Sequence, residues 1–378
     1  MKPDYVDAYH KLGLAYWHID DFDKAIEVYS KAIELDPDNA DSYYYRGLAF
    51  VGKDEVDKGI SDFGKVIELK PDYVDAYHKL GLAYWHIDDF DKAIEVHSKA
   101  IDLNPKNAYS YYYRGLSYSD KGEQDKAISD FSKAIELNSE FSLAYYFRGR
   151  VYSKKEEFDQ AIENYTKAIA LNPDDADVYF NRGIVYVEKG EKDNAISDYT
   201  KVIDLNPESA IPHFCRGGVY HAKGEFDNAI TDYSKAIELG TDSAEIYSLR
   251  GSAYYDKNNY KYAIEDYARA IRLDPNDPAL YNNLGVAYFN IGEIKRAIEN
   301  YTKAITIKPD HARSYYNRGE CWLHLKEWEK AKTDLKDAKN MGIDVIAAFR
   351  DVYENIEDFN QKTGIQLQED IAALLIQQ

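Results

Sequence analysis

The chain has 378 residues, of which 30% are charged, and its formal net charge is −20. Such a charge repels phosphate backbones and anionic lipids, so we expect neither nucleic acid nor a membrane as a partner. No apolar run approaches the roughly 18 residues needed to cross a bilayer, and the first residues lack the apolar core of a secretory signal, which favours a cytoplasmic protein. The two cysteines, Cys215 and Cys321, lie far apart and give no sign of a disulfide framework or a zinc site.

The sequence repeats itself with a fixed period. The segment KPDYVDAYHKLGLAYWHIDDFDKAIEV occurs twice without a difference, at residues 2–28 and 70–96. A glycine recurs every 34 residues through ten units, at Gly13, Gly47, Gly81, Gly115, Gly149, Gly183, Gly217, Gly251, Gly285 and Gly319. This self-similarity predicts an array of stacked units rather than separate globular domains. We place the units at residues 6–39, 40–73, 74–107, 108–141, 142–175, 176–209, 210–243, 244–277, 278–311 and 312–345, followed by a C-terminal helical cap and tail at 346–378.

Each unit has the pattern of two amphipathic helices. In the first unit, Tyr9, Leu12, Gly13 and Tyr16 share one face of a helix, and the same spacing recurs over residues 25–33. Residues that tolerate a left-handed backbone occupy the expected turn between the two helices. They are Asp20, Asp54, Gly122, Gly190, Gly224, Asn258 and Gly292.

The recurring residues LG or RG, AY and DxAIxxYxKAIELxP resemble the tetratricopeptide repeat over residues 6 to about 345. The resemblance implies an all-α, right-handed superhelical α-solenoid of helix-turn-helix units, each with an A helix and a B helix. It also implies a non-enzymatic scaffold for protein–protein interaction. The sequence has no nucleophile elbow, phosphate loop or metal-ligand constellation, so we expect neither catalysis nor a cofactor or metal. Positions in each repeat are counted from Val6, which is position 1 of the first.

Positions 7 and 23 change together. Position 7 is arginine in seven repeats, at Arg46, Arg114, Arg148, Arg182, Arg216, Arg250 and Arg318. Position 23 is then aspartate, or asparagine at Asn164, whereas repeats with leucine at position 7 have valine or asparagine there. A helical hairpin places these two positions at the same height, which predicts an arginine–aspartate bridge inside each repeat. The alternative is a row of arginines that binds anionic ligands, but a nearby acid for almost every arginine favours the bridge.

The resemblance implies that positions 2, 5, 9, 12 and 13 of the A helices line a concave binding face. Aromatic residues, leucines and carboxylates occupy these positions in the N-terminal half. We therefore expect this face to bind a protein or peptide with apolar anchors and basic flanks. The candidate residues are Asp7, His10, Leu14, Trp17, Asp41, Tyr44, Leu48, Asp75, His78, Leu82, Trp85, Tyr112, Leu116, Tyr146, Phe180 and Phe214.

An alternative is equally compatible with the pattern at positions 5 and 9. Their side chains would then pack between successive A helices and expose little to a partner. Two recognition modes known in the family do not carry over. No repeat has the lysine at position 5 and asparagine at position 9 of the chaperone-binding clamp, and only Asn181, Asn283 and Asn317 stand at the asparagine position of the sugar-transferring members.

The two ends of the array differ. From about Asp344 the period fails, and the apolar spacing of residues 345–359 predicts one amphipathic helix that covers the last repeat. We expect Gly364 to end this helix and QEDIAALLIQQ to form a short final helix that folds back on it, with a docking tail as the alternative. No capping helix precedes the first repeat, so self-assembly by stacking through this uncapped repeat is the alternative function.

Overall fold

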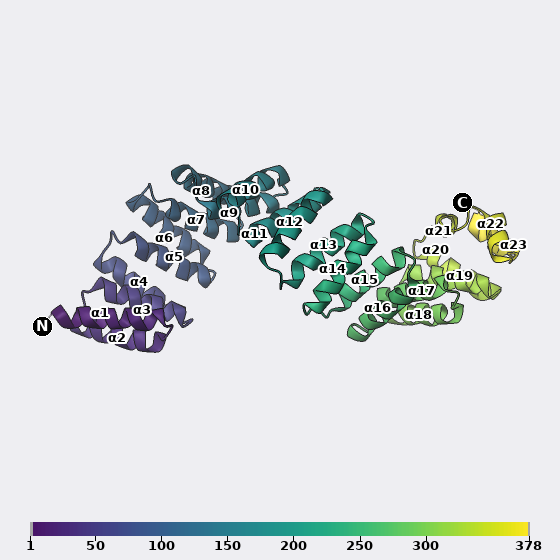
Figure 1. The fold of residues 1–378 in the computed structure, drawn as a ribbon, viewed down its shortest axis with the longest axis horizontal. Coiled ribbons are helices and arrows are strands. Elements are labelled where there is room, and N and C mark those ends of the chain that lie inside the picture. Colours follow the sequence, from purple (N-terminus) through teal and green to yellow (C-terminus); the bar gives the residue numbers. More distant parts are fainter. Residues whose placement is uncertain (1–2, 377–378) are drawn as a thin grey trace. The chain divides into compact units, whose positions relative to one another are not determined.

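The computed structural model describes residues 3–376, with side-chain surroundings from Val6 to Ile376. Every regular element in this range is an α-helix, and the chain forms two compact units that divide after Gly190 (Figure 1). The first unit contains α1 (Pro3–His18), α2 (Phe22–Leu35), α3 (Ala40–Gly52), α4 (Val56–Leu69), α5 (Val74–His86), α6 (Phe90–Leu103), α7 (Ala108–Asp120), α8 (Gln124–Leu137), α9 (Ser142–Lys154), α10 (Phe158–Leu171) and α11 (Ala176–Glu188). The second contains α12 (Lys192–Leu205), α13 (Ala210–Ala222), α14 (Phe226–Glu238), α15 (Ala244–Asp256), α16 (Tyr260–Leu273), α17 (Pro278–Asn290), α18 (Ile294–Ile307), α19 (Ala312–His324), α20 (Trp328–Asn340), α21 (Val345–Arg350), α22 (Ile356–Thr363) and α23 (Glu369–Ile376).

Within each unit the helices pack mainly on their neighbours in the sequence. An odd-numbered A helix forms a hairpin with the B helix that follows it, and that B helix packs against the next A helix. Each repeat therefore buries its apolar faces against the repeat before and the repeat after it. The predicted all-α helical solenoid is confirmed.

The glycine at position 8 lets the two helices of a repeat approach closely. A Cβ atom at Gly285 would lie 2.5 Å from Cε1 of Tyr301, and one at Gly47 would lie 2.8 Å from Cε1 of Phe63. These rings belong to position 24 of the B helix, and they are buried. Any larger residue at position 8 would collide with the ring, so the period in glycine records a packing requirement.

The predicted turn residues have the expected left-handed backbone. The φ angles are 57° at Asp20, 66° at Asp54 and 60° at Asn258, and the four predicted turn glycines also have positive φ. The turn joins the A and B helices of a repeat in three residues, so its conformation fixes how the hairpin closes.

The arginine at position 7 joins three helices. Arg250 on α15 donates from Nε and Nη2 to both carboxylate oxygens of Asp266 on α16, at 2.8 and 2.7 Å. Its Nη1 donates to Oγ of Ser234 on α14, which is position 25 of the preceding repeat, at 3.0 Å. We call this set of three residues the arginine clamp. Because Asp266 is buried and its partner satisfies both oxygens, the clamp is a bidentate ion pair in the interior.

The same clamp recurs along the chain, so the predicted bridge is confirmed at the other described pairs. The further clamps are Arg46 with Asp62 and Ser30, Arg114 with Asp130 and Ser98, Arg216 with Asp232 and Thr200, and Arg318 with Asp334 and Thr302. Arg148 uses Asn164 in place of the aspartate, with a single bond of 2.8 Å. Arg182 and Asp198 lie in different units, and their pairing stays a prediction.

The contact with the preceding repeat has its own signature in the sequence. Position 25 is serine or threonine wherever the next repeat has arginine at position 7. It is Gly64 before Leu80 and Ala268 before Leu284, where no guanidinium needs an acceptor. The clamp is therefore present or absent as a set of three positions that spans two repeats.

The C-terminal cap differs from the prediction. Two helices, α21 and α22, replace the single amphipathic helix expected over residues 345–359. Asn355 starts the second helix, because its Oδ1 accepts from the backbone N–H of Asp358 at 3.0 Å, while Oδ2 of Asp358 accepts from the N–H of Glu354 at 3.0 Å. Val352, assigned to the apolar stripe, falls in the break and is 49% exposed.

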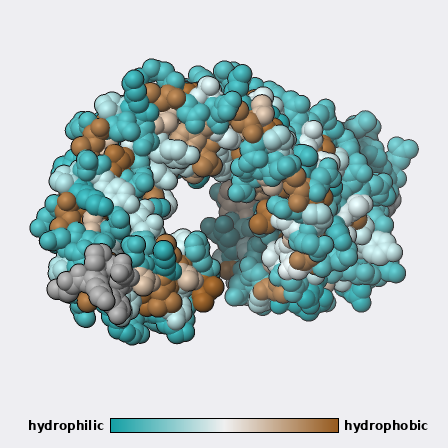
Figure 2. Space-filling model, turned by 60° about the vertical axis from the view of Figure 1, so that its left-hand side comes forward, coloured by the Kyte–Doolittle hydropathy of each residue, from teal (hydrophilic) through white to brown (hydrophobic). Residues whose placement is uncertain are grey.

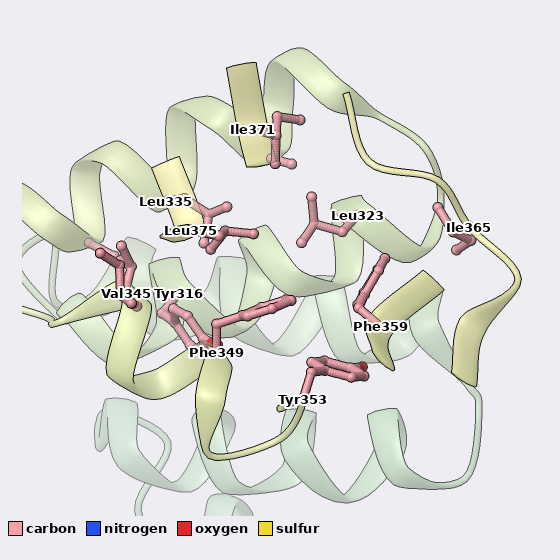
Figure 3. Close-up of a cluster of buried hydrophobic side chains, with 13 residues drawn as sticks. Tyr316, Leu323, Leu335, Val345, Phe349, Tyr353, Phe359, Ile365, Ile371 and Leu375 are labelled. Atoms are coloured by element: carbon pink, nitrogen blue, oxygen red, sulfur yellow. The ribbon is translucent and has the colours of Figure 1, made fainter. Parts of the chain in front are cut away.

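The final helix folds back on the cap, as the leading interpretation predicted. Figure 3 shows Ile371 and Leu375 of α23 directed toward Leu335 and Leu323 of the last repeat. Other labelled members of this buried cluster come from the last repeat, α21, α22 and the segments that follow them (Figure 3): Tyr316, Val345, Phe349, Tyr353, Phe359 and Ile365. The apolar end of the array is thus covered, and the alternative of a free docking tail does not describe α23.

One buried side chain differs from the tyrosines and phenylalanines that occupy position 24 in most repeats. His97 is 0% exposed, neither ring nitrogen has a hydrogen-bond partner among the described residues, and its ring stacks on Tyr113 at a centroid distance of 5.6 Å. The duplicated first repeat has Tyr29 at this place, packed in the same way against Gly13. Burial lowers the pKa of His97 from 6.5 to about 3, with smaller contributions from His78 and Arg114.

We expect His97 to make the folded protein less stable as the pH is lowered. Between pH 6.5 and 3 the unfolded chain binds a proton at this side chain that the folded chain does not, so the free energy of unfolding decreases as the pH falls through that window. Between pH 7 and pH 5 this side chain should cost the wild type about 2 kcal/mol of its free energy of unfolding. The variant His97→Tyr should not show that part of the loss. Urea unfolding at the two pH values, for wild type and variant, measures it. Equal losses in both proteins would contradict the assignment.

Candidate functional site

The aromatic residues at position 5 mostly form joints between adjacent A helices. Tyr44, His78 and Tyr112 are only 8%, 7% and 6% exposed. The Tyr44 ring stacks on Tyr73 at 5.3 Å, and Nε2 of His78 lies 2.8 Å from Oγ of Ser110 on the next A helix. At these three residues the packing alternative describes the structure, so the prediction of an exposed aromatic track is wrong there. The helical wheel missed this because it shows only the core inside one repeat.

The remaining candidate rings at position 5 are half-buried: His10, Tyr146, Phe180 and Phe214. His10 lies edge-on to Tyr45 at 4.9 Å, and the Tyr146 hydroxyl accepts from Nδ2 of Asn181 at 3.2 Å. Phe180 is half-buried at the end of the first unit, whereas Phe214 belongs to the second unit and packs on Tyr233 there. These four candidate residues are partly accessible, in contrast to Tyr44, His78 and Tyr112.

Positions 9 and 12 remain accessible in the first unit. Leu14, Leu48, Leu82 and Leu116 are all half-buried, as is Trp17, and each leaves part of its side chain in solvent. The indole of Trp85 is 36% exposed and donates from Nε1 to Oδ2 of Asp120 on the next A helix at 2.8 Å. That bond fixes the indole ring on the surface. The leucine side chains have no polar group that could be held in this way.

The carboxylates at position 2 lie beside the leucines at position 9. Asp7 and Asp75 are exposed, and Asp41 is half-exposed and accepts from Nζ of Lys70 at 3.0 Å. We define the A-helix surface as the candidate residues predicted from the sequence at positions 2, 9 and 12 of α1, α3, α5 and α7, all of which remain accessible. Its members are Asp7, Leu14, Trp17, Asp41, Leu48, Asp75, Leu82, Trp85 and Leu116.

A small pocket opens on this surface between α5 and α7. Its volume is about 180 Å³, and it is lined by Asp75, His78, Lys79, Leu82, Asn107, Tyr109 and Tyr113. Burial lowers the pKa of His78, although Asp75 nearby raises it in part, so the imidazole is held neutral. Tyr109, which is 51% exposed, was missed by the sequence reasoning because position 2 is acidic in the preceding repeats.

No three His, Cys, Asp or Glu side chains group around a common point within residues 3–376. No helix in the described part of the chain is both long and apolar enough to span a membrane. On the face drawn in Figure 2, hydrophobic residues form separate patches among hydrophilic ones.

Comparison with known proteins agrees with this architecture. A family model described as TPR repeat matches residues 19–54, 87–122, 149–190, 217–257 and 251–292. A second model, described as tetratricopeptide repeat, matches residues 108–141, 176–209 and 278–311. No curated protein matches this chain.

Several solved structures are similar in fold. YrrB, described as a TPR protein with an unusual peptide-binding site, is 26% identical, with a TM-score of 0.44, over 50% of this chain and 98% of its own. A tetratricopeptide repeat protein from Parabacteroides merdae is 24% identical, with a TM-score of 0.48, over 63% of this chain and 94% of its own. The C-terminal part of a TPR repeat-containing protein from Cytophaga hutchinsonii is 19% identical, with a TM-score of 0.56, over 64% and 99%.

The two family models together reach from the first repeat to the ninth, and their matches cover more than half of the residues. The chain belongs to the tetratricopeptide repeat family.

Proposed function

We propose that the A-helix surface of the first unit binds a peptide segment of a partner protein, and that the chain acts as a non-enzymatic interaction scaffold in the cytoplasm. The single observation that carries the proposal is the row of half-buried leucines, one in each of four successive A helices, beside the carboxylates at position 2. The family assignment supports a protein-interaction scaffold in general.

The leucine row supports apolar anchors on the partner. Leu14, Leu48, Leu82 and Leu116 recur at the same place in successive repeats, so their spacing along the surface is regular. Full burial of one such side chain contributes about 1.5–3 kcal/mol, and these leucines still have apolar area to bury. A peptide whose apolar residues recur at matching intervals gains this contribution several times.

The carboxylates support basic flanks. Asp7 and Asp75 are exposed without an ion-pair partner at close range in the described residues, apart from His78 at 3.9 Å from Asp75. The net charge of −20 adds a long-range attraction for cationic segments. Such charges at the rim of an interface act on the association rate and on partner choice.

We expect the position 2 carboxylates to control binding. Random peptides displayed on phage and selected on the intact protein should combine apolar residues with lysine or arginine. The triple substitution Asp7→Asn, Asp41→Asn and Asp75→Asn should lower the affinity for the selected peptides roughly tenfold, because three charges at the rim are lost. Isothermal titration at low salt measures the change.

The matched control removes three charges from the B helices of the same repeats. Glu34→Gln, Glu68→Gln and Asp102→Asn lie at position 29 and are exposed. This control triple should leave the affinity unchanged. If both triples weaken binding equally, only net charge matters, and if neither does, the A-helix surface is not the site.

A second candidate function is self-association through the first repeat. Leu12 is 44% exposed, whereas its copy Leu80 is 7% exposed because the preceding repeat covers it. Ala8 is likewise exposed, although its copy Ala76 is fully buried. The contrast supports an exposed apolar face on α1, made of the same residues that α5 buries against the repeat before it.

We expect a self-associating protein to sediment as larger species when its concentration rises. Substituting Leu12→Glu should return it to a monomer without loss of helicity, because this side chain is exposed at the outer face of α1. A monomer at every concentration tested, in wild type as in the variant, would exclude this function and leave the peptide-binding proposal intact.

A further inference from the structure

The second unit contains a cavity with an acidic lining. Its volume is about 790 Å³, and it lies between the A helices α15, α17 and α19 and the capping helix α21. Four carboxylates line it, Asp256, Glu320, Asp344 and Asp351, against one cationic side chain, Arg313. The volume lies in the range of ordinary ligand sites. Its charge selects against anions.

Glu320 is the unusual residue in this lining. It stands at position 9, which is leucine in the first four repeats. Its Oε1 atom is buried and accepts no hydrogen bond from any residue between 3 and 376, while the carboxyl interacts with the hydroxyl of Tyr353. Burial raises the pKa of Glu320 to about 7. A buried carboxylate with one unpartnered oxygen is costly unless it is protonated or a cation reaches it.

Neighbouring amides present further acceptors to the cavity. Asn290 donates from Nδ2 to the hydroxyl of Tyr255 at 3.0 Å, and Asn317 donates from Nδ2 to Oδ1 of Asn282 at 3.0 Å. Nδ2 of Asn290 also donates to the backbone oxygen of Val286 at 2.9 Å, so both of its N–H groups are engaged and its carbonyl oxygen is left as an acceptor. Asn317 keeps one N–H group and its carbonyl oxygen. Both residues line the cavity with Glu320. The lining thus combines a buried carboxylate with neutral acceptors, which suits a group that only donates.

We infer that this cavity binds a primary alkylammonium group, with Glu320 as its counter-ion. An ammonium is a compact point charge with three donors and no acceptor, which matches one carboxylate oxygen surrounded by carbonyl oxygens. The group comes either from a lysine side chain of a partner or from a free polyamine. The inference does not rest on the peptide-binding proposal, because it concerns residues of the other unit.

The experiment titrates the intact protein with three probes at pH 8, where the carboxyl is ionised and the ammonium is still protonated. The probes are N-acetyl-lysine methylamide, its uncharged norleucine analogue, and putrescine. We expect at least one of the two ammonium probes to bind saturably and the norleucine analogue not to bind. Tighter binding of the lysine probe assigns the site to a protein partner, and tighter binding of putrescine assigns it to a free amine.

Variants locate the binding at Glu320. Substituting Glu320→Gln keeps the shape of the side chain and should weaken the ammonium probe at least tenfold, whereas Glu299→Gln, exposed on α18 and outside the cavity, should not change it. Asp351→Asn, at the exposed margin of the cavity, should weaken binding by a smaller factor that disappears at high salt. Circular dichroism checks that each variant is folded.

Three results would overturn the inference. They are the absence of saturable binding by both ammonium probes, equal binding of the norleucine analogue, and unchanged binding of the ammonium probes in folded Glu320→Gln. None of them bears on the A-helix surface, whose test uses peptides and residues of the first unit.

Discussion

A half-buried guanidinium group that contacts two repeats at once joins most of the adjacent units of this solenoid. Arg250 occupies both oxygens of Asp266 in its own repeat and the hydroxyl of Ser234 in the repeat before it. The contact with aspartate closes the hairpin, and the contact with serine fixes the next repeat on the previous one. Because the aspartate is buried, removal of either member of the pair would leave an unpaired charge in the interior. The spacing between successive A helices therefore depends on this clamp where position 7 is arginine, and on the packing of buried Leu80 and Leu284 where it is leucine.

That spacing decides which side chains a partner can reach. Once adjacent A helices are fixed, the residues at position 5 fill the joint between them, as Tyr44 and Tyr112 do. The residues at positions 2, 9 and 12 stay at the surface and recur at regular intervals. In the second unit the same spacing, together with α21, leaves a cavity around Glu320 instead of a leucine row. One architecture thus presents two surfaces with different chemistry, an apolar row edged by acid and a carboxylate among neutral acceptors.

Much of the fold could be predicted because ten repeats act as internal comparisons. The joint change at positions 7 and 23 predicted the bridge, and the turn residues predicted the left-handed φ angles. What failed were contacts that cross from one repeat to the next. The burial of Tyr44 follows from a neighbouring helix that a helical wheel of one repeat does not include. The break at Asn355 left the apolar spacing intact, so only its reciprocal cap with Asp358 signalled it. The cavity at Glu320 needs four separate helices in place before it exists.

The central claim is that the arginine clamp acts as one unit across two repeats, and the chain itself supplies the alternative set. Repeat 9 has Leu284 and Asn300 at positions 7 and 23, with Ala268 at position 25 of the repeat before it. Urea unfolding of the variant Arg250→Leu, which leaves Asp266 buried without its partner, should show a loss of about 3–5 kcal/mol. The triple variant Arg250→Leu, Asp266→Asn and Ser234→Ala should lose no more than about 1 kcal/mol, since it installs the set of repeat 9. A triple variant as unstable as the sum of the three single variants would contradict the claim.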